Sequence, residues 1–150
     1  MIHTHGVILL VEDNLDHAEL VRRGFAHHAM AVRLYHLEDG ASALDYLFQR
    51  GAYADPDSSP RPAIILLDLR LPRVDGLTVL QTIKAAPELN HIPVIILTTS
   101  QAEADVARAY DAHANSYLVK PVEFSEFVNL VRELGCYWLE WNTSPRKLAA

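Results

Sequence analysis

The stretch AIILLDLRLPRVDG, Ala63 to Gly76, decides the fold. Its first five residues, Ala63 to Leu67, are apolar on consecutive positions, which is typical of a parallel strand buried on both faces. Asp68 follows directly, and a proline and a glycine come within the next eight residues. An aspartate in this place is often only a turn former or a helix cap. The rest of the chain has to decide what Asp68 does.

Four further segments have the pattern of strands, and helical patterns separate them. The strands are expected at Val7 to Val11, Val32 to Leu37, Ile92 to Leu97 and Tyr117 to Val119. The helices are expected at Leu15 to His28, Ala41 to Gln49, Leu77 to Ala86, Gln101 to Ala112 and from about Glu123 onward. Asn14 is expected to cap the first helix, and Ser100 with Glu103 to form a capping box at the fourth. This alternation predicts an α/β fold, a doubly wound five-stranded parallel sheet with five helices.

Length and composition indicate one compact domain in a reducing compartment. The chain has 150 residues, half of them hydrophobic and 21% charged, and a net charge of -6 that gives no support to a nucleic-acid surface. The single cysteine, Cys136, excludes an internal disulfide framework. No signal peptide and no apolar run near the ~20 residues of a membrane span is visible. We therefore expect a soluble, cytoplasmic protein without nucleic-acid or membrane partners.

Polar side chains follow the strands at their carboxyl ends, where sheets of this kind bind ligands. The set comprises Glu12, Asp13, Asp68, Thr98 and Lys120. Three carboxylates close together repel one another and demand a cation, and their hard oxygens suit Mg²⁺. A lysine and a threonine add the positive charge and the hydrogen-bond donor that a phosphoryl group needs. The sequence predicts a phosphoryl site built around Asp68.

Four motifs in order carry a resemblance to a known family. They are VEDN at 11–14, LLDLRLPRVDG at 66–76, ILTTS at 96–100 and SYLVKP at 116–121. With intervals of 30 residues from Asp68 to Thr98 and 22 from Thr98 to Lys120, the chain resembles a CheY-like response-regulator receiver domain from Val7 to about Leu139. The resemblance implies the flavodoxin-like strand order 2-1-3-4-5. It also implies a single receiver domain over 1–150, with a core of about 7–139 and a C-terminal aromatic extension of about 136–150.

The resemblance assigns a role to each site residue. Asp68 is expected to be the phosphoacceptor. Mg²⁺ is expected on Asp13 and Asp68 directly, on Glu12 through water, and on the backbone carbonyl of Arg70.

The same resemblance implies a switch. Lys120 is expected to pair with a phosphoryl oxygen, with a cis Lys120–Pro121 peptide placing the ammonium over the site. Thr98 is expected to move toward the phosphoryl group, which vacates space into which Tyr117 turns. The Arg70 side chain is left open among three positions: against the phosphate, against Glu12, or in solvent.

The partners follow from the same family. The loop Arg50 to Ala63, the TTS signature, NSYLVKP and the tail CYWLEW are similar to those of stand-alone regulators paired with bacterial phytochrome kinases. The implied donor is a sensor histidine kinase, including a bacteriophytochrome, and the implied assembly is a homodimer. Its contacts are expected on the face of the fourth helix, fifth strand and fifth helix, or on the aromatic tail Cys136 to Trp141. The implied protein is not an enzyme, although it catalyses its own phosphoryl transfer and dephosphorylation.

Two other functions are compatible with parts of the sequence. A pseudo-receiver would keep the fold as a binding module without the chemistry, which the complete set of site residues disfavours. A phosphatase of the haloacid-dehalogenase class would also use an aspartyl nucleophile. That class places a second Asp two residues further on as its acid and base, and Arg70 stands there instead.

Overall fold

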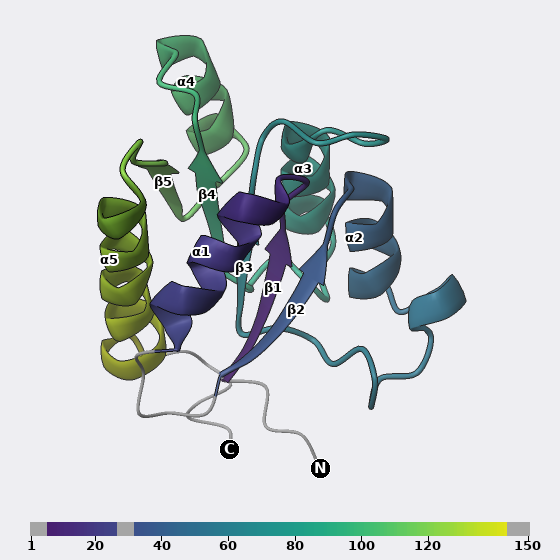
Figure 1. Ribbon diagram of the computed structural model, residues 1–150. Helices are drawn as coiled ribbons and strands as arrows, with labels where there is room; N and C mark the ends of the chain where they lie inside the picture. Colours follow the sequence, from purple (N-terminus) through teal and green to yellow (C-terminus); the bar gives the residue numbers. More distant parts are fainter. Residues whose placement is uncertain (1–5, 27–31, 144–150) are drawn as a thin grey trace.

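Five parallel strands form the centre of the computed structural model, which describes residues 6–26 and 32–143 (Figure 1). The strands are β1 (Val7–Val11), β2 (Arg33–Leu37), β3 (Ile64–Leu67), β4 (Val94–Thr98) and β5 (Ser116–Val119). They lie in the order β2-β1-β3-β4-β5, and all four pairings are parallel. Both the doubly wound fold and its strand order are therefore confirmed.

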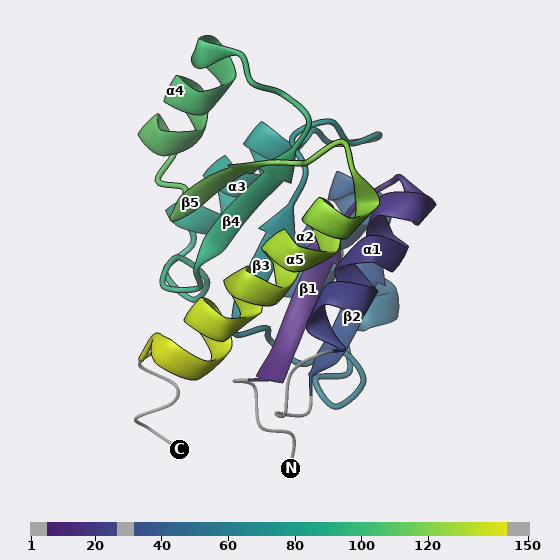
Figure 2. The ribbon, with the colours of Figure 1, turned by 60° about the vertical axis from the view of Figure 1, so that its left-hand side comes forward.

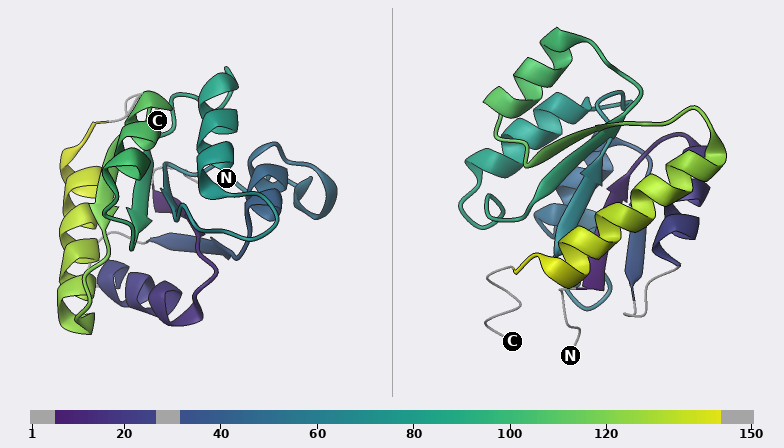
Figure 3. Two further views of the ribbon diagram at one scale, coloured as in Figure 1. Left: turned by 90° about the horizontal axis from the view of Figure 1, so that it is seen from above. Right: turned by 90° about the vertical axis from the view of Figure 1, so that its left-hand side faces the viewer.

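Five α-helices cover the two faces of this sheet. They are α1 (Leu15–Phe25), α2 (Gly40–Leu47), α3 (Gly76–Ala85), α4 (Glu103–Asp111) and α5 (Phe124–Gly135). Helices α1 and α5 lie side by side on one face, with α2 and α3 on the other (Figures 2 and 3). No helix in the described ranges is long and apolar enough to cross a membrane.

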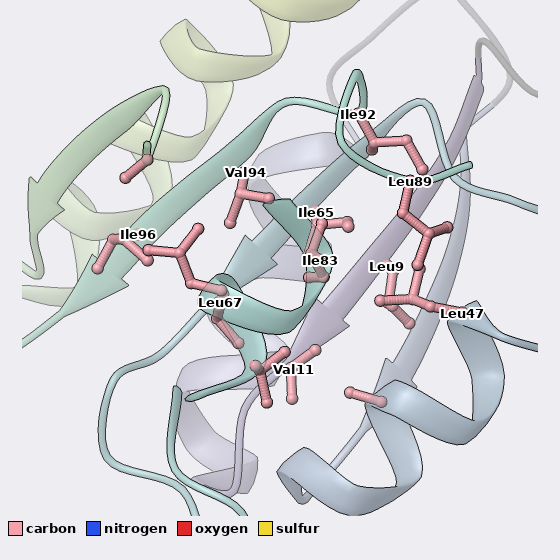
Figure 4. Close-up of a cluster of buried hydrophobic side chains, with 14 of the residues drawn as sticks. Leu9, Val11, Leu47, Ile65, Leu67, Ile83, Leu89, Ile92, Val94 and Ile96 are labelled. Atoms are coloured by element: carbon pink, nitrogen blue, oxygen red, sulfur yellow. The ribbon is translucent and has the colours of Figure 1, made fainter. Parts of the chain in front are cut away.

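Two hydrophobic clusters, one on each face, explain why every central strand is apolar on consecutive positions. Successive side chains along a strand point to opposite faces of the sheet and so belong to different clusters. Leu9 and Val11 lie under α2 and α3, while Ile8 and Leu10 lie under α1 and α5. Figure 4 shows the first cluster, in which labelled side chains from β1, β3 and β4 meet Leu47 of α2 and Ile83 of α3. This packing fixes the register of the strands and hence the edge at which their polar neighbours emerge.

Helix starts agree with the sequence patterns in one case and differ in another. Asn14 caps α1 as expected, since its side chain accepts hydrogen bonds from the backbone N–H groups of Asp16 and His17. The capping box of Ser100 and Glu103 is wrong: α4 begins at Glu103 without a side-chain cap, because the Ser100 hydroxyl is engaged by Asp105 instead. The expected end of the first helix at His28 lies outside the described residues.

The loop between α2 and β3 is ordered at its end nearest the sheet. It opens with a short 3-10 turn, Gly51–Tyr53, and Ser59 is buried. The buried Tyr46 hydroxyl donates to the carbonyl of Pro60 at 2.7 Å, and the Arg61 guanidinium donates to the carbonyl of Leu47 at 3.1 Å. These hydrogen bonds thus attach this part of the loop to α2.

The aromatic tail continues α5 as a π-helical segment, Cys136–Trp141. Leu139 is buried and Trp138 packs against the cluster under α1 and α5, so part of the tail folds onto its own domain. Tyr137 and Trp141 are 54% and 80% exposed. Residues 144–150 of the expected extension lie outside the described residues.

Candidate functional site

The fold brings the predicted polar residues to one edge of the sheet. Glu12 and Asp13 follow β1, Asp68 follows β3, Thr98 ends β4 and Lys120 follows β5. The backbone hydrogen bonds between neighbouring strands continue to the residues that follow the strands. Asp68 N–H donates to Val11 O at 3.1 Å, and Lys120 N–H donates to Thr98 O at 2.7 Å. The backbone thus places five functional groups from four strands around one point.

Three carboxylates, from Glu12, Asp13 and Asp68, form the acidic half of the site. One oxygen from each can be chosen so that all three lie within 4.8 Å of one another. Glu12 and Asp68 are buried and Asp13 is exposed. Hard oxygen ligands with one side open to water suit a divalent cation that keeps part of its hydration shell. The donor set therefore fits such a cation, and this acidic pocket is a candidate metal site.

The Lys120 ammonium, almost completely buried, forms the basic half. Its Nζ lies 2.6 Å from Glu12 Oε1 and 2.8 Å from Asp68 Oδ2. The expected cis Lys120–Pro121 peptide is wrong, because no cis peptide bond occurs between described residues. The trans chain still reaches the carboxylates because β5 ends directly beside β4.

Burial dominates the ionisation of Glu12. Loss of water contact raises the pKa of this carboxyl to about 7, and the nearby Asp68 adds to the rise. The hydrogen bond and charge of Lys120 oppose it but do not cancel it. Glu12 therefore changes charge near neutral pH, whereas an exposed glutamate would be ionised throughout.

Thr98 contributes a donor without a partner. Its side chain is fully buried, and within the described part of the chain its hydroxyl oxygen makes no hydrogen bond. An unpaired buried hydroxyl costs roughly 1–3 kcal/mol. Such a group at the sheet edge that also carries Asp68 and Lys120 is explained if a further ligand with acceptor oxygens completes the site.

Arg70 and Tyr117 both reach the start of α4. The Arg70 guanidinium donates to Asp105 Oδ2 at 2.9 Å, a partner that was not among the three expected positions, and the side chain is otherwise largely exposed. The Ser100 hydroxyl donates to the same oxygen at 2.5 Å, and the Tyr117 hydroxyl donates to the Ser100 carbonyl at 3.0 Å. Burial raises the pKa of Tyr117, which keeps this hydroxyl a donor. The loop after Thr98 is thus held from two sides.

The glycine in the opening stretch has a packing role. A Cβ on Gly76 would lie 2.1 Å from the carbonyl oxygen of Asp68, so only glycine fits here. Gly76 N–H donates to the Leu69 carbonyl, and Asp75 caps α3 by accepting from Thr78 N–H. These contacts hold the start of α3 close to the backbone of Asp68.

A cleft of about 600 Å³ opens beside the site. Asp13, Arg70, Pro72, Asp105 and Arg108 are among the residues that line it. It gives a small molecule or a partner side chain access to the acidic pocket.

Two further residues of the site, both histidines, were not revealed by the sequence patterns. His17 Nδ1 lies 2.9 Å from Lys120 Nζ, and His36 Nε2 lies 2.7 Å from the backbone carbonyl of Glu12. His17 stands one helical turn after Asp13 on a helix whose cap was recognised, so helical spacing could have placed it at this edge. His36 pairs through the register of β1 and β2, which the sequence does not specify at single-residue level.

Comparisons with known proteins agree with this geometry. The model of the response regulator receiver domain matches residues 8–132. The probable methanogenesis regulatory protein FilR2 of Methanothrix harundinacea is 47% identical over 139 residues, covering 93% of this chain and 87% of that protein. Response regulator Rcp1 of Synechocystis is 42% identical over 139 residues, covering 93% of this chain and 92% of that protein.

Solved structures give the same result. The Mn²⁺-bound form of Rcp1 superimposes with a TM-score of 0.87 at 42% identity, covering 93% of this chain and 99% of that one. The phosphorylated cyanobacterial phytochrome response regulator RcpA gives 0.90 at 39% identity, covering 94% and 99%. With the strand order, the acidic pocket and the family match in agreement, the chain belongs to the response regulator receiver domain family.

Proposed function

We propose that this protein is a response regulator of a two-component phosphorelay, in which Asp68 accepts a phosphoryl group from a sensor histidine kinase. A carboxylate oxygen of Asp68 attacks phosphorus, the P–N bond of the kinase phosphohistidine breaks, and the imidazole leaves and takes up a proton. The observation that carries this proposal is the contact of Asp68 with the Lys120 ammonium at 2.8 Å, at the same sheet edge as the unpaired Thr98 hydroxyl. Positive charge and a free donor are what the oxygens of a phosphoryl group require.

Mg²⁺ is the proposed cation. Asp13 and Asp68 would hold it directly, Glu12 through water, and the backbone carbonyl of Arg70 would add a fourth protein group. When bound, the cation supplies charge that offsets the repulsion between the attacking carboxylate and the phosphoryl oxygens. The exposed position of Asp13 leaves room for the waters that Mg²⁺ retains.

The proposed switch runs from Thr98 to Tyr117. A phosphoryl oxygen would accept from the Thr98 hydroxyl and another from Lys120, which amounts to roughly 3–6 kcal/mol for two charge-assisted hydrogen bonds. Reversing a two-state equilibrium from 1:99 to 99:1 takes about 5.5 kcal/mol. Movement of Thr98 would let Tyr117 turn inward and give up its bond to Ser100. The phosphoryl group can therefore control the β4–α4 loop.

The proposed phosphodonor is a histidine kinase, including one of the phytochrome class. RcpA is a phytochrome response regulator, which supports that class, whereas FilR2 is named for methanogenesis regulation. The receiver chemistry is common to both and does not depend on which signal the kinase senses. A kinase of this kind would meet the regulator in the cytoplasm.

A homodimer is the proposed output form. Within the single receiver domain of the chain, with its core at about 7–139, apolar side chains are exposed along β5, α5 and the tail. They include Val119, Val122, Phe124, Tyr137 and Trp141. Val119, Val122 and Phe124 lie around the start of α5, whereas Tyr137 and Trp141 follow its end, and large exposed apolar groups are typical of protein contact surfaces.

Phosphorylation with a small donor tests the proposal. Wild type and Asp68→Asn are incubated with Mg²⁺ and acetyl phosphate, and protein-bound phosphate is followed by its acid stability and base lability. Asp57→Asn is the matched control, since Asp57 is exposed in the loop at the opposite edge of the sheet. We expect incorporation in wild type and Asp57→Asn but not in Asp68→Asn. Equal incorporation in all three, or none in wild type with either acetyl phosphate or phosphorylated kinases, would contradict the proposal.

A further inference from the structure

The Lys120 ammonium is held by three acceptors, and one of them is unexpected. Besides Glu12 Oε1 at 2.6 Å and Asp68 Oδ2 at 2.8 Å, His17 Nδ1 lies at 2.9 Å. An ammonium has three N–H donors and no acceptor, so these contacts use its whole capacity. The position of Lys120 therefore depends on α1 as well as on the two carboxylates.

The contact fixes the state of the His17 ring. Because an ammonium can only donate, Nδ1 must carry a lone pair, which places the ring proton on Nε2 and leaves the imidazole neutral. Phe127 of α5 packs against the other side, with ring centroids 5.6 Å apart. Burial first and the Lys120 charge second lower the pKa of His17, in keeping with a neutral ring. The charged groups that act on it are Lys120, Asp68, Asp16 and Asp13.

A metal ion in the acidic pocket would affect the three acceptors of the Lys120 ammonium differently. Glu12 and Asp68 belong to the acidic pocket, so a divalent cation would draw on their charge and repel the ammonium. His17 is outside that set. Its hydrogen bond with Lys120 can therefore persist when the cation binds to the carboxylates.

From this difference we propose that His17 is a positioning residue that keeps the Lys120 ammonium beside Asp68 when a divalent cation occupies the acidic pocket. The inference rests on the proposed function and names a further residue of the same site. It assigns to the first turns of α1 a role in phosphoryl transfer that acts through Lys120 and not through contact with the phosphoryl group.

Two substitutions of His17 distinguish the loss of its hydrogen-bond acceptor from the loss of its ring. Asn in His17→Asn places an oxygen near the position of Nδ1 and can still accept from Lys120, whereas His17→Leu fills space without an acceptor. We expect the rate of phosphorylation by acetyl phosphate with Mg²⁺ to fall about tenfold in His17→Leu, the effect of one misplaced charged group, and to stay within about threefold in His17→Asn. His113→Asn is the control, because His113 is exposed at φ 71°, a conformation that Asn accepts.

A double-mutant cycle distinguishes positioning from a merely structural effect. In a Lys120→Met background, His17→Leu should cause no further loss of rate, because the group that it positions is absent. Circular dichroism and melting temperature verify that each variant is folded. An unchanged rate in His17→Leu, or an equal loss in both backgrounds, would overturn the inference while leaving Asp68 as the acceptor.

Nitrogen NMR of the imidazole ring tests the contact without any phosphorylation. In wild type, with and without saturating Mg²⁺, His17 should show a neutral ring with the proton on Nε2, and its signals should shift in Lys120→Met. A proton on Nδ1, or a contact that disappears when Mg²⁺ is added, would refute the positioning role. If wild type accepts no phosphate, the proposed function fails separately and this spectrum still decides the contact.

Discussion

At the scale of single residues, the Lys120 ammonium lies between the buried carboxylates of Glu12 and Asp68. The motifs placed Glu12, Asp13, Asp68, Thr98 and Lys120 at one edge, and the structure brings them together there. The Arg70–Asp105 pair and the His17–Lys120 contact were not predictable in the same way. Both join side chains far apart in the sequence whose directions depend on packing around helices.

Glu12 should make stability depend on pH. Its pKa rises from 4.5 to about 7 in the fold, so the folded state holds the proton more tightly than the unfolded chain. The contribution of Glu12 to the free energy of unfolding is therefore fully present below pH ~4.5, falls as the pH rises from there to about 7, and is lost above that. At ~1.4 kcal/mol for each unit of pKa, the loss is on the order of 3 kcal/mol.

Urea unfolding of wild type and Glu12→Gln without metal, at pH 5 and pH 8, checks this expectation. Glutamine cannot ionise, so the variant should gain stability relative to wild type at the higher pH. A difference that stays constant between the two pH values would show that Glu12 has an ordinary pKa.

At the scale of elements, four consecutive apolar runs and the alternating segment Val32 to Leu37 were enough to predict five strands, and helical spacing predicted the helices between them. The strand ends shifted by only one or two residues, and burial on both faces defines the runs of the central strands β1, β3 and β4. Local signals at helix ends were less reliable: Ser100 was interpreted as a cap, but its hydroxyl binds the Asp105 carboxylate. When a side chain has two possible partners, tertiary structure decides which of them it binds.

Close packing of α1 on α5 gives the prediction at this scale. A Cβ on Gly24 would lie 2.5 Å from Cβ of the buried Val131, so the two helices would have to move apart. Gly24→Ala should therefore lower the free energy of unfolding by about 1–3 kcal/mol, even though alanine favours a helix over glycine by about 1 kcal/mol.

Denaturant unfolding of Gly24→Ala, Val131→Ala and the double variant measures the effect. Val131→Ala removes Cγ1, which would lie 2.6 Å from the new Cβ, although the contact with Cβ of residue 131 remains, so the double variant should lose less than the sum of the single losses. Strict additivity, or a stabilised Gly24→Ala, would show that the helices are not in tight contact here.

At the scale of the whole molecule, the side chains of the tail Cys136–Trp141 divide between the core and the surface. Trp138 and Leu139 pack on the domain, whereas Tyr137 and Trp141 face outward. The same short segment thus both closes the core and leaves two aromatic side chains exposed.

Removing that surface should prevent association. We expect wild type to have a molar mass near twice the 16.8 kDa of the chain, and the double variant Tyr137→Ser, Trp141→Ser to have the mass of one chain. Size-exclusion chromatography with light scattering gives both values. Leu15→Ser is the control, because Leu15 is also exposed but lies at the start of α1, at the opposite end of the helical layer. Equal masses for wild type and the double variant would refute a dimer through the tail.

The central claim is that one carboxylate, Asp68, receives the phosphoryl group, and mapping the acceptor tests it most directly. Reduction of the phosphorylated protein with borohydride converts an aspartyl phosphate to homoserine, which tandem mass spectrometry locates. We predict homoserine at position 68 and at no other aspartate. Homoserine at Asp13 or another carboxylate, or unmodified Asp68 in protein that carries phosphate, would contradict the account.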